Sequence, residues 1–363
     1  MATMKAVRIF EFGGPDKLIY ADYPMPEVGP SDVLVKVMAS TVSRWDIHYR
    51  QGDVHRFARA KTRHGGDIGR KPFQLPMQLG RDVAGEVVAV GQAVTTFQPG
   101  QRVVGLVHPE NSNSLEAIRG LGNLSTGVDL PGHTMFGGYA QYVSRANFYW
   151  LPIADSVAYD DIAAAMWACS TSFHIVNSRL KVRPNDCVLV TGASGGMGTA
   201  TMQIARLAGA TVIATTRSMD KAQRLLAIGA DHVLDIGASD IEDQIKDMTR
   251  GQGVDCAAEF TGAIETLRLC VDVMRLGGTL CPVAGELNDL PIKVADLVSK
   301  ELNVHGVRAS TRNDQRIVTE LVEKRRLRVP IHAVLPLSEV AAALKLLEDG
   351  DTVGRIVLHP WDM

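Results

Sequence analysis

A glycine-rich turn between an apolar run and a helical pattern constrains the fold most. The run Val188-Leu189-Val190 leads into residues 192–198, and a second apolar run, 212–214, follows the helical pattern. A strand, glycine turn, helix and strand in this order are typical of the phosphate-binding half of a dinucleotide fold. Glycines admit a pyrophosphate close to the backbone, and the first helical amides bind it. The predicted cradle comprises Ala193, Ser194, Gly195, Gly196, Met197 and Gly198.

Composition excludes several other classes of protein. The 363 residues are 46% hydrophobic with a net charge of −2, which fits two globular domains and gives no case for nucleic acid or a membrane surface as partner. The five cysteines have no C-x-x-C spacing, which suits a reducing compartment. Neither a signal peptide nor a membrane-spanning run of about 18–20 apolar residues is found. We predict a cytoplasmic protein that acts on a small molecule.

Two kinds of pattern divide the chain. Alternating segments at 5–10 and 32–37, and short glycine-punctuated segments from 79 to 104, predict a barrel-like β domain. After Pro152 helix and strand signals alternate, which predicts an α/β doubly wound parallel sheet. The predicted helices are 160–176, 220–228 and 338–348, and the further strands are 233–234, 254–258, 279–283 and 355–358.

Ordered landmarks carry a family resemblance over nearly the whole chain. They are Leu79-Gly80, Gly85-Glu86-Val87, 99–103, Gly137-Gly138-Tyr139-Ala140, the glycine turn, Gly277-Gly278 and 354–358. The chain resembles the medium-chain dehydrogenase/reductase superfamily. This resemblance implies a GroES-like β-barrel catalytic domain at 1–167 and 312–363, a Rossmann cofactor domain at 168–311, and a homodimer or homotetramer.

The metal ligands of the zinc-dependent relatives are replaced in this sequence. By resemblance, the three catalytic ligand positions hold Ser43, Arg81 and Trp167, and neither a guanidinium nor an indole binds zinc. The four structural-zinc positions hold Asn111, Ser114, Ala117 and Ser125. We expect no metal; a new set made of His48, His55 and His64 is the alternative.

Without zinc the chain is similar to the quinone oxidoreductase and enoyl reductase branches, in which NADPH reduces an activated C=C bond or a quinone. His48 is the first candidate proton donor, with a solvated loop histidine as the alternative, and Tyr49 is the second. Trp45 would shape the pocket. Arg81 would hold a substrate carbonyl, carboxylate or phosphate, or else form a salt bridge with Asp82 or Asp46. Asp46 is expected to keep a structural role.

The predicted nicotinamide cofactor is NADPH. The second strand of the dinucleotide unit ends without an acid for the ribose hydroxyls, and Thr216, Arg217, Ser218 and Lys221 suit a 2′-phosphate. By resemblance, Thr171 faces the nicotinamide and Arg355 approaches the pyrophosphate. Segments that contain Thr261, Gly262, Ala284 and Gly285 would close over the ring.

Two further possibilities remain open from the sequence. Residues 54–71 are strongly basic and would recruit an anionic substrate or form a solvated loop. The alternative activities are a metal-free carbonyl reductase or alcohol dehydrogenase that uses His48 as the acid, and a catalytically silent NADPH-binding protein.

Overall fold

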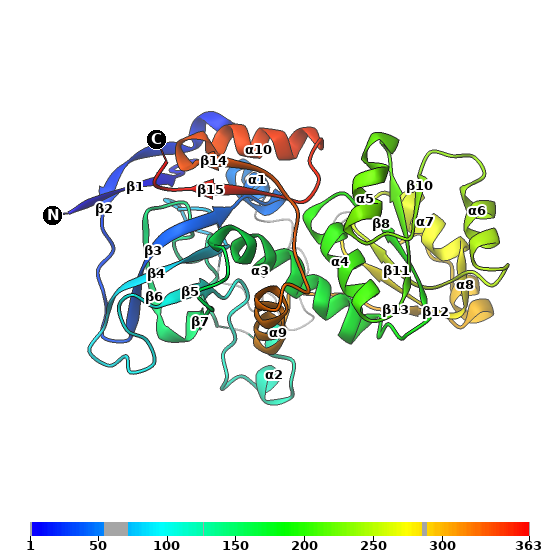
Figure 1. Ribbon diagram of the computed structural model, residues 1–363, viewed down its shortest axis with the longest axis horizontal. Coiled ribbons are helices and arrows are strands. Elements are labelled where there is room, and N and C mark those ends of the chain that lie inside the picture. Colours follow the sequence, from blue (N-terminus) through cyan, green and yellow to red (C-terminus); the bar gives the residue numbers. More distant parts are fainter. Residues whose placement is uncertain (1, 54–71, 126, 285–288, 363) are drawn as a thin grey trace. The chain divides into compact units, whose positions relative to one another are not determined.

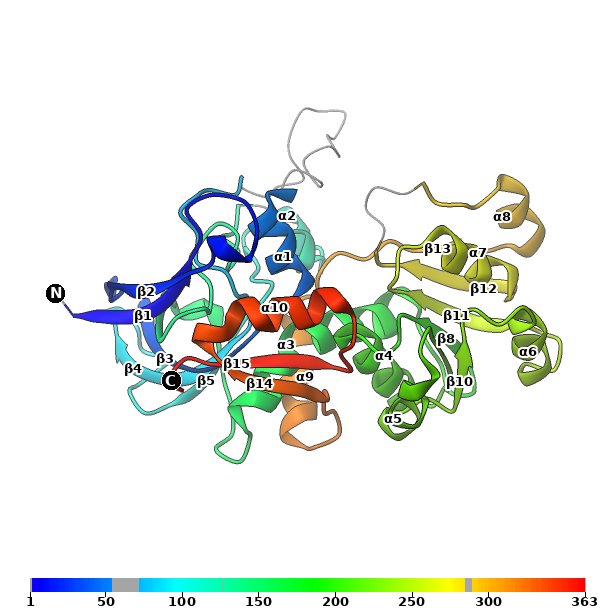
Figure 2. The same ribbon diagram turned by 90° about the horizontal axis from the view of Figure 1, so that it is seen from above.

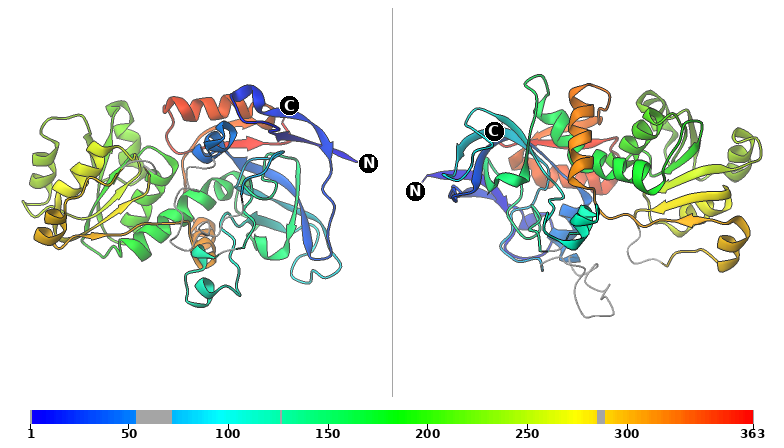
Figure 3. Two further views of the ribbon diagram at one scale, coloured as in Figure 1. Left: turned by 180° about the vertical axis from the view of Figure 1, so that it is seen from behind. Right: turned by 90° about the horizontal axis from the view of Figure 1, so that it is seen from below.

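The computed structural model describes residues 2–53, 72–125, 127–284 and 289–362. The chain folds into two compact units. Unit 1 comprises residues 1–167 and 310–363, and unit 2 comprises residues 168–309. Both ends of the chain therefore belong to unit 1 (Figure 3).

Unit 2 is built on a parallel sheet whose strand order, over the described residues, is β10-β9-β8-β11-β12-β13 (Figure 1). The central strand β8 is buried on both faces, which explains why its sequence is a continuous apolar run instead of an alternating one. This sheet confirms the predicted doubly wound α/β class. Its strands are β8 (Cys187–Thr191), β9 (Thr211–Thr216), β10 (His232–Asp235), β11 (Val254–Glu259), β12 (Met274–Pro282) and β13 (Asn303–Val304).

Helices connect these strands. Helix α4 packs against β8 and β9 and buries Met202, Ile204 and Ala205, while Arg206 and Leu207 on its other side are exposed. The helices of unit 2 are α4 (Gly196–Leu207), α5 (Ala222–Ile228), α6 (Ile241–Met248), α7 (Ile264–Asp272) and α8 (Val294–Lys300).

Strand β12 begins earlier than the sequence pattern predicts. It starts at Met274 and runs through Gly277 and Gly278, whereas the prediction placed the strand after the two glycines. Gly277 has φ +71°, and the register with β11 shifts across this stretch, so the glycines form an irregularity inside the strand.

Unit 1 contains a mainly antiparallel sheet with the order β14-β15-β3-β4-β5-β7 over the described residues, and β6 pairs with β3. Strands β1 and β2 form a separate antiparallel hairpin. The core lies under alternating residues such as Val33, Val35 and Val37 of β3. The strands are β1 (Thr3–Arg8), β2 (Ile19–Pro24), β3 (Asp32–Thr41), β4 (Val83–Val90), β5 (Arg102–Gly105), β6 (Tyr142–Ala146), β7 (Trp150–Pro152), β14 (Ile331–Pro336) and β15 (Arg355–His359).

Five α-helices of the described residues lie wholly or partly in unit 1. Helix α10 packs against α1 and β14 (Figure 2). The helices are α1 (Arg44–Gln51), α2 (Leu115–Ile118), α3 (Tyr159–Phe173), α9 (Arg312–Glu323) and α10 (Val340–Asp349). Helix α3 continues as a wider π-helix over His174–Arg179. No helix within the described part of the chain is long and apolar enough to cross a bilayer.

Candidate active site

The glycine turn of unit 2 has the geometry of a phosphate cradle. Gly192 has φ +63°, which a side chain rarely adopts. A Cβ atom on Gly198 would stand 2.4 Å from the carbonyl oxygen of Gly192 and 2.7 Å from the Cα atom of Ala193. Glycine at position 198 therefore lets α4 pack directly on the turn that ends β8.

Gly195 differs from Gly198 because the protein does not crowd it. It is the N-cap residue of α4, with φ −70°, and a Cβ atom there would meet nothing closer than 3.6 Å. A side chain at this position would therefore make only an ordinary van der Waals contact with the protein, and the first amides of α4 that follow are of the kind that bind a pyrophosphate. The buried Thr171 hydroxyl on α3 has no hydrogen-bond partner among the described residues. Both observations fit a bound dinucleotide.

The end of β9 carries the residues predicted for the 2′-phosphate. The Thr216 hydroxyl bonds the backbone of Ser218 and so shapes the turn that presents Arg217, which is exposed. Lys221 follows within a single 3₁₀ turn. The register of the parallel strands places Asp235, at the end of β10, beside Thr216. Sequence reasoning overlooked this carboxylate because it belongs to the next strand.

Glu259 organises the loop predicted to cover the nicotinamide. Its buried carboxylate accepts hydrogen bonds from the Thr191 hydroxyl at 3.0 Å, the Thr261 amide at 2.8 Å and the Gly262 amide at 3.0 Å. It therefore joins the end of β11 to the end of β8 beside the glycine turn. The sequence signal that could have indicated this role is the acidic residue Glu259 at the end of the mostly apolar strand β11. Ala284 forms a bend after β12, and Gly285 lies outside the described residues.

In unit 1, helix α1 presents three of the predicted catalytic side chains and is fixed by Asp46. One Asp46 oxygen accepts from the amide and hydroxyl of Ser43, at 2.8 and 2.7 Å, and the other accepts from the Gly80 amide at 3.0 Å. Burial raises the pKa of Asp46, and the bonds from Ser43 and Gly80 oppose that rise. Asp46 thus caps the helix and holds it against residue 80.

Asp82 forms a second buried anchor. Its carboxylate accepts from Arg355 Nη2 at 2.6 Å, from the Thr41 hydroxyl at 2.6 Å and from the Trp167 amide at 3.0 Å. Burial raises the pKa of Asp82, and the positive charge of Arg355 opposes the rise. Arg355 therefore has an internal partner; its approach to a pyrophosphate stays a prediction.

Arg81 is the central side chain of this cluster in unit 1. It is 3% exposed. Its Nε donates to the Pro131 carbonyl at 3.2 Å, its Nη2 donates to the Tyr49 hydroxyl at 3.1 Å, and its Cζ lies 4.2 Å from the centre of a Trp167 ring. Within the described residues no carboxylate lies within 4.0 Å of its nitrogens, so the alternative of a salt bridge with Asp82 or Asp46 is wrong: those carboxylates are bonded elsewhere.

Trp167 and Tyr49, the two aromatic partners of Arg81, belong to a larger cluster of rings. Trp45 stacks on Trp167 with ring centres 6.5 Å apart and lies 5.6 Å from Tyr49. Tyr49 also contacts His133 and Phe73, at 5.1 and 5.2 Å. Sequence reasoning missed His133 and Phe73 because no local motif links them to α1. Tyr49, Trp45 and Arg81 are thus brought together.

His48 lies at the rim of this cluster. Its ring meets Trp45 edge to face at 6.1 Å, and its Nδ1 is 3.5 Å from a carboxylate oxygen of Asp53. The side chain is 29% exposed. His55, His64 and the basic segment 54–71 lie outside the described residues.

The former zinc positions do not present a zinc-binding donor set. The Ser43 hydroxyl bonds Asp46, a guanidinium stands at position 81, and an indole at 167. In the lobe of the second metal, Ser114 caps α2 by accepting from the Ala117 amide and bonds the Ser125 hydroxyl, both at 3.1 Å. Hydrogen bonds thus connect Ser114, Ala117 and Ser125, three of the four positions predicted from the resemblance.

Comparison with known proteins agrees with this architecture. Residues 29–155 match the alcohol dehydrogenase GroES-like domain, and residues 196–324 match the zinc-binding dehydrogenase family. A crystal structure of an NAD-dependent alcohol dehydrogenase is 30% identical, with a TM-score of 0.88 and coverage of 98% of this chain and 99% of that chain. The chain belongs to the medium-chain dehydrogenase/reductase superfamily.

Two relatives in this superfamily differ in the acceptor they are named for. The quinone oxidoreductase of Rattus norvegicus is 29% identical over 367 residues, covering 98% of this chain and 97% of its own. The 2-haloacrylate reductase of a Burkholderia species is 26% identical over 376 residues, covering 99% of each. The protein is therefore an oxidoreductase of this superfamily.

Proposed function

We propose that this oxidoreductase uses NADPH and no zinc to reduce a carbon–carbon double bond conjugated to a carbonyl or carboxylate, or a quinone. The observation that carries the proposal is the environment of Arg81. Arg81 is buried and has no carboxylate partner within the part of the chain that the structure describes. Such a guanidinium is costly unless an anionic or strongly polar group joins it. A substrate oxygen that becomes negative during the reaction is such a group.

The chemistry follows from the groups around Arg81. When bound, the dinucleotide supplies a hydride. Hydride addition to the β-carbon moves negative charge to the conjugated oxygen, which Arg81 stabilises by donating hydrogen bonds. The Tyr49 hydroxyl accepts from Arg81, so its own proton is available for the α-carbon. Its O–H bond breaks as the C–H bond forms, and water then returns a proton to the phenolate beside Arg81.

Product analysis is the first test. The purified, metal-analysed protein is incubated with NADPH and an α,β-unsaturated ketone. A saturated ketone is the expected product. An allylic alcohol would overturn the proposal in favour of carbonyl reduction with His48 as the acid. Tight NADPH binding with no product from ketone, acrylate or quinone would favour a catalytically silent NADPH-binding protein. Stoichiometric zinc that is required for activity would contradict the proposal of a metal-free enzyme.

Variants of Arg81 separate catalysis from folding. Arg81→Met removes a buried charge, so we expect the apoprotein to become as stable as the native protein or more stable. We expect kcat/KM to fall about 100- to 1,000-fold because the developing oxyanion loses its donors. Arg119→Gln, which removes an exposed charge in unit 1, is the control and should change neither quantity. A kcat/KM close to that of the native protein in Arg81→Met would refute this role.

Tyr49 is tested separately. Tyr49→Phe keeps the ring between Trp45, Phe73 and His133 and removes the hydroxyl bonded to Arg81. We expect a loss of about 100-fold or more in kcat, whereas His48→Gln should retain most activity. The opposite ranking of the two variants would assign the proton to His48.

The preference for NADPH rests on the end of β9. Arg217 and Lys221 offer positive charge and Ser218 a hydroxyl, which suits a 2′-phosphate. Asp235 beside Thr216 is the competing feature, because a carboxylate near the ribose favours NADH. The ratio of kcat/KM for NADPH to that for NADH decides between them. We expect about tenfold in favour of NADPH, and a ratio below one would overturn the preference.

A further inference from the structure

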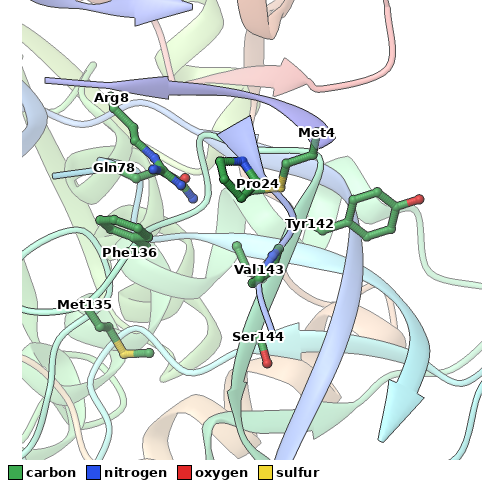
Figure 4. A pocket seen from close by; sticks show the side chains of 10 residues that line it. Met4, Arg8, Pro24, Gln78, Met135, Phe136, Tyr142, Val143 and Ser144 are labelled. Carbon is green, nitrogen blue, oxygen red and sulfur yellow. The ribbon is translucent and has the colours of Figure 1, made fainter. Parts of the chain in front are cut away.

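A second arginine, again without an acidic partner among the described residues, lines a cavity in unit 1 that the proposed reaction does not use. The cavity has a volume of about 410 Å³ and lies between strand β1, the end of β2, the segment before Tyr139 and strand β6 (Figure 4). Its walls are mostly apolar, and Arg8 is its cationic side chain. The residues that line it include Met4, Arg8, Pro24, Met135, Phe136 and Ser144.

Aromatic rings position the guanidinium of Arg8. Its Cζ lies 4.2 Å from the centre of the Tyr23 ring and 4.4 Å from that of Phe136. Such contacts use the flat faces of a guanidinium and leave the N–H donors at its edge for other partners. In Figure 4 the guanidinium points in from β1, above the ring of Phe136 and beside Gln78.

No described protein group bonds those donors, and the Arg8 side chain is half-buried. Within the described residues, the Arg8 side chain makes no hydrogen bond, and no carboxylate lies within 4.0 Å of it; its Nε is buried without a partner. Asp22 of the neighbouring strand β2 is paired with Lys5 of β1. Burial lowers the pKa of Arg8, and Tyr23 opposes that change. A ligand oxygen would satisfy the guanidinium in the way that a carboxylate normally does.

We propose that this cavity binds a small carboxylate with an apolar body, such as a medium-chain or aryl monocarboxylate, at a site separate from Arg81. The carboxylate would bond the edge of the Arg8 guanidinium. The apolar part would cover Met4, Pro24 and Met135, and also Phe136, which is 41% exposed. A cavity of this volume lies in the range that encloses small organic ligands.

Titration calorimetry of the whole protein with octanoate tests the proposal. Two further probes are octan-1-ol, which lacks the carboxylate, and inorganic phosphate, which lacks the apolar chain. We expect octanoate to bind at least about tenfold more tightly than either. Arg8→Gln should weaken octanoate binding about tenfold or more, and Arg8→Lys should weaken it less, because the charge remains while the planar fork is lost. Ser144→Leu, which fills the cavity and keeps Arg8, should also weaken binding.

Two control variants locate the site. Lys5→Gln removes a charge from the same strand outside the cavity and should leave octanoate binding unchanged. Arg81→Met should also leave it unchanged if the site is separate. Loss of octanoate binding in Arg81→Met but not in Arg8→Gln would assign the ligand to the active site and overturn the proposal. Equal binding of octan-1-ol, or no binding of octanoate at millimolar concentration, would also overturn it.

Discussion

Replacing two glycines of the same turn by alanine is expected to affect two different properties, the stability of the fold at Gly198 and the binding of NADPH at Gly195. At Gly198 the new Cβ atom would stand 2.4 Å from the Gly192 oxygen, whereas a carbon–oxygen contact needs about 3.3 Å. Helix α4 and the turn would therefore have to separate by about 0.9 Å. At Gly195 the nearest heavy atom is 3.6 Å away, so the apoprotein accepts the methyl group.

The magnitudes follow from this difference. Overpacking of the kind forced by Gly198→Ala lowers the free energy of unfolding by about 1–3 kcal/mol. Gly195→Ala changes only the preference at a helix N-cap, which is worth about 1 kcal/mol or less. The methyl group at Gly195 would instead occupy space for the pyrophosphate. A penalty of about 1–3 kcal/mol there raises the Kd for NADPH roughly 5- to 150-fold.

Thermal unfolding of the apoprotein and fluorescence titration with NADPH measure the two quantities. Gly198→Ala should lower the unfolding temperature; Gly195→Ala should chiefly raise Kd. Gly306→Ala, where a Cβ meets nothing within 4 Å, is the control for both. An unaltered Kd in Gly195→Ala would refute the cradle, and equal destabilisation by Gly195→Ala and Gly198→Ala would refute the assignment of their separate roles.

Three further predictions concern stability and cofactor choice. Asp82→Asn should lower the free energy of unfolding by about 3–5 kcal/mol in a urea titration, because it breaks a buried ion pair. Asp22→Asn, at an exposed pair, should lower it by less than about 1 kcal/mol. Equal losses in the two variants would contradict the burial argument. Burial lowers the pKa of His359, but Asp160 and a neighbouring acid outweigh this, and the net pKa lies above its usual 6.5. The protonated ring therefore stabilises the fold fully below about pH 6.5, and this effect is lost as the pH rises through the raised pKa. The difference in unfolding temperature between the native protein and His359→Gln should be larger at pH 6 than at pH 9. A difference that does not change with pH would contradict this role of His359. Arg217→Ser should lower kcat/KM for NADPH about tenfold and leave NADH unaffected, and equal effects on both cofactors would show that Arg217 does not contact a 2′-phosphate.

The sequence was sufficient for the dinucleotide unit because its signals are local. Strand β8, the glycine turn and α4 follow one another in the chain, and burial of β8 on both faces leaves a continuous apolar run. Strand β2 was not predicted, because its residues are mostly exposed or half-buried and show no apolar alternation. The shape of β12 depends on pairing with β11, which the pattern at Gly277 does not reveal.

The candidate site was predictable only in part. The replacement at position 81 is visible in the sequence, but its meaning depends on partners from distant segments. Arg81 contacts Tyr49, Pro131 and Trp167. Asp82 is bonded to Arg355 and not to Arg81. No local pattern carries such information, and the same holds for the anchor formed by Glu259.

The division of the chain between the two units has a consequence for how the protein is made. Strand β3 of unit 1 pairs with β15, which is synthesised more than 300 residues later, whereas the strands of unit 2 are contiguous in the chain. On a ribosome, where domains fold as their residues emerge, unit 2 has its complete sheet before unit 1 does. The end of β3 at Ser40 and Thr41 therefore waits for β15 through much of translation, while β4 and β6 already pair with the rest of β3. This interval, more than the finished fold, is where the newly made chain is exposed to aggregation.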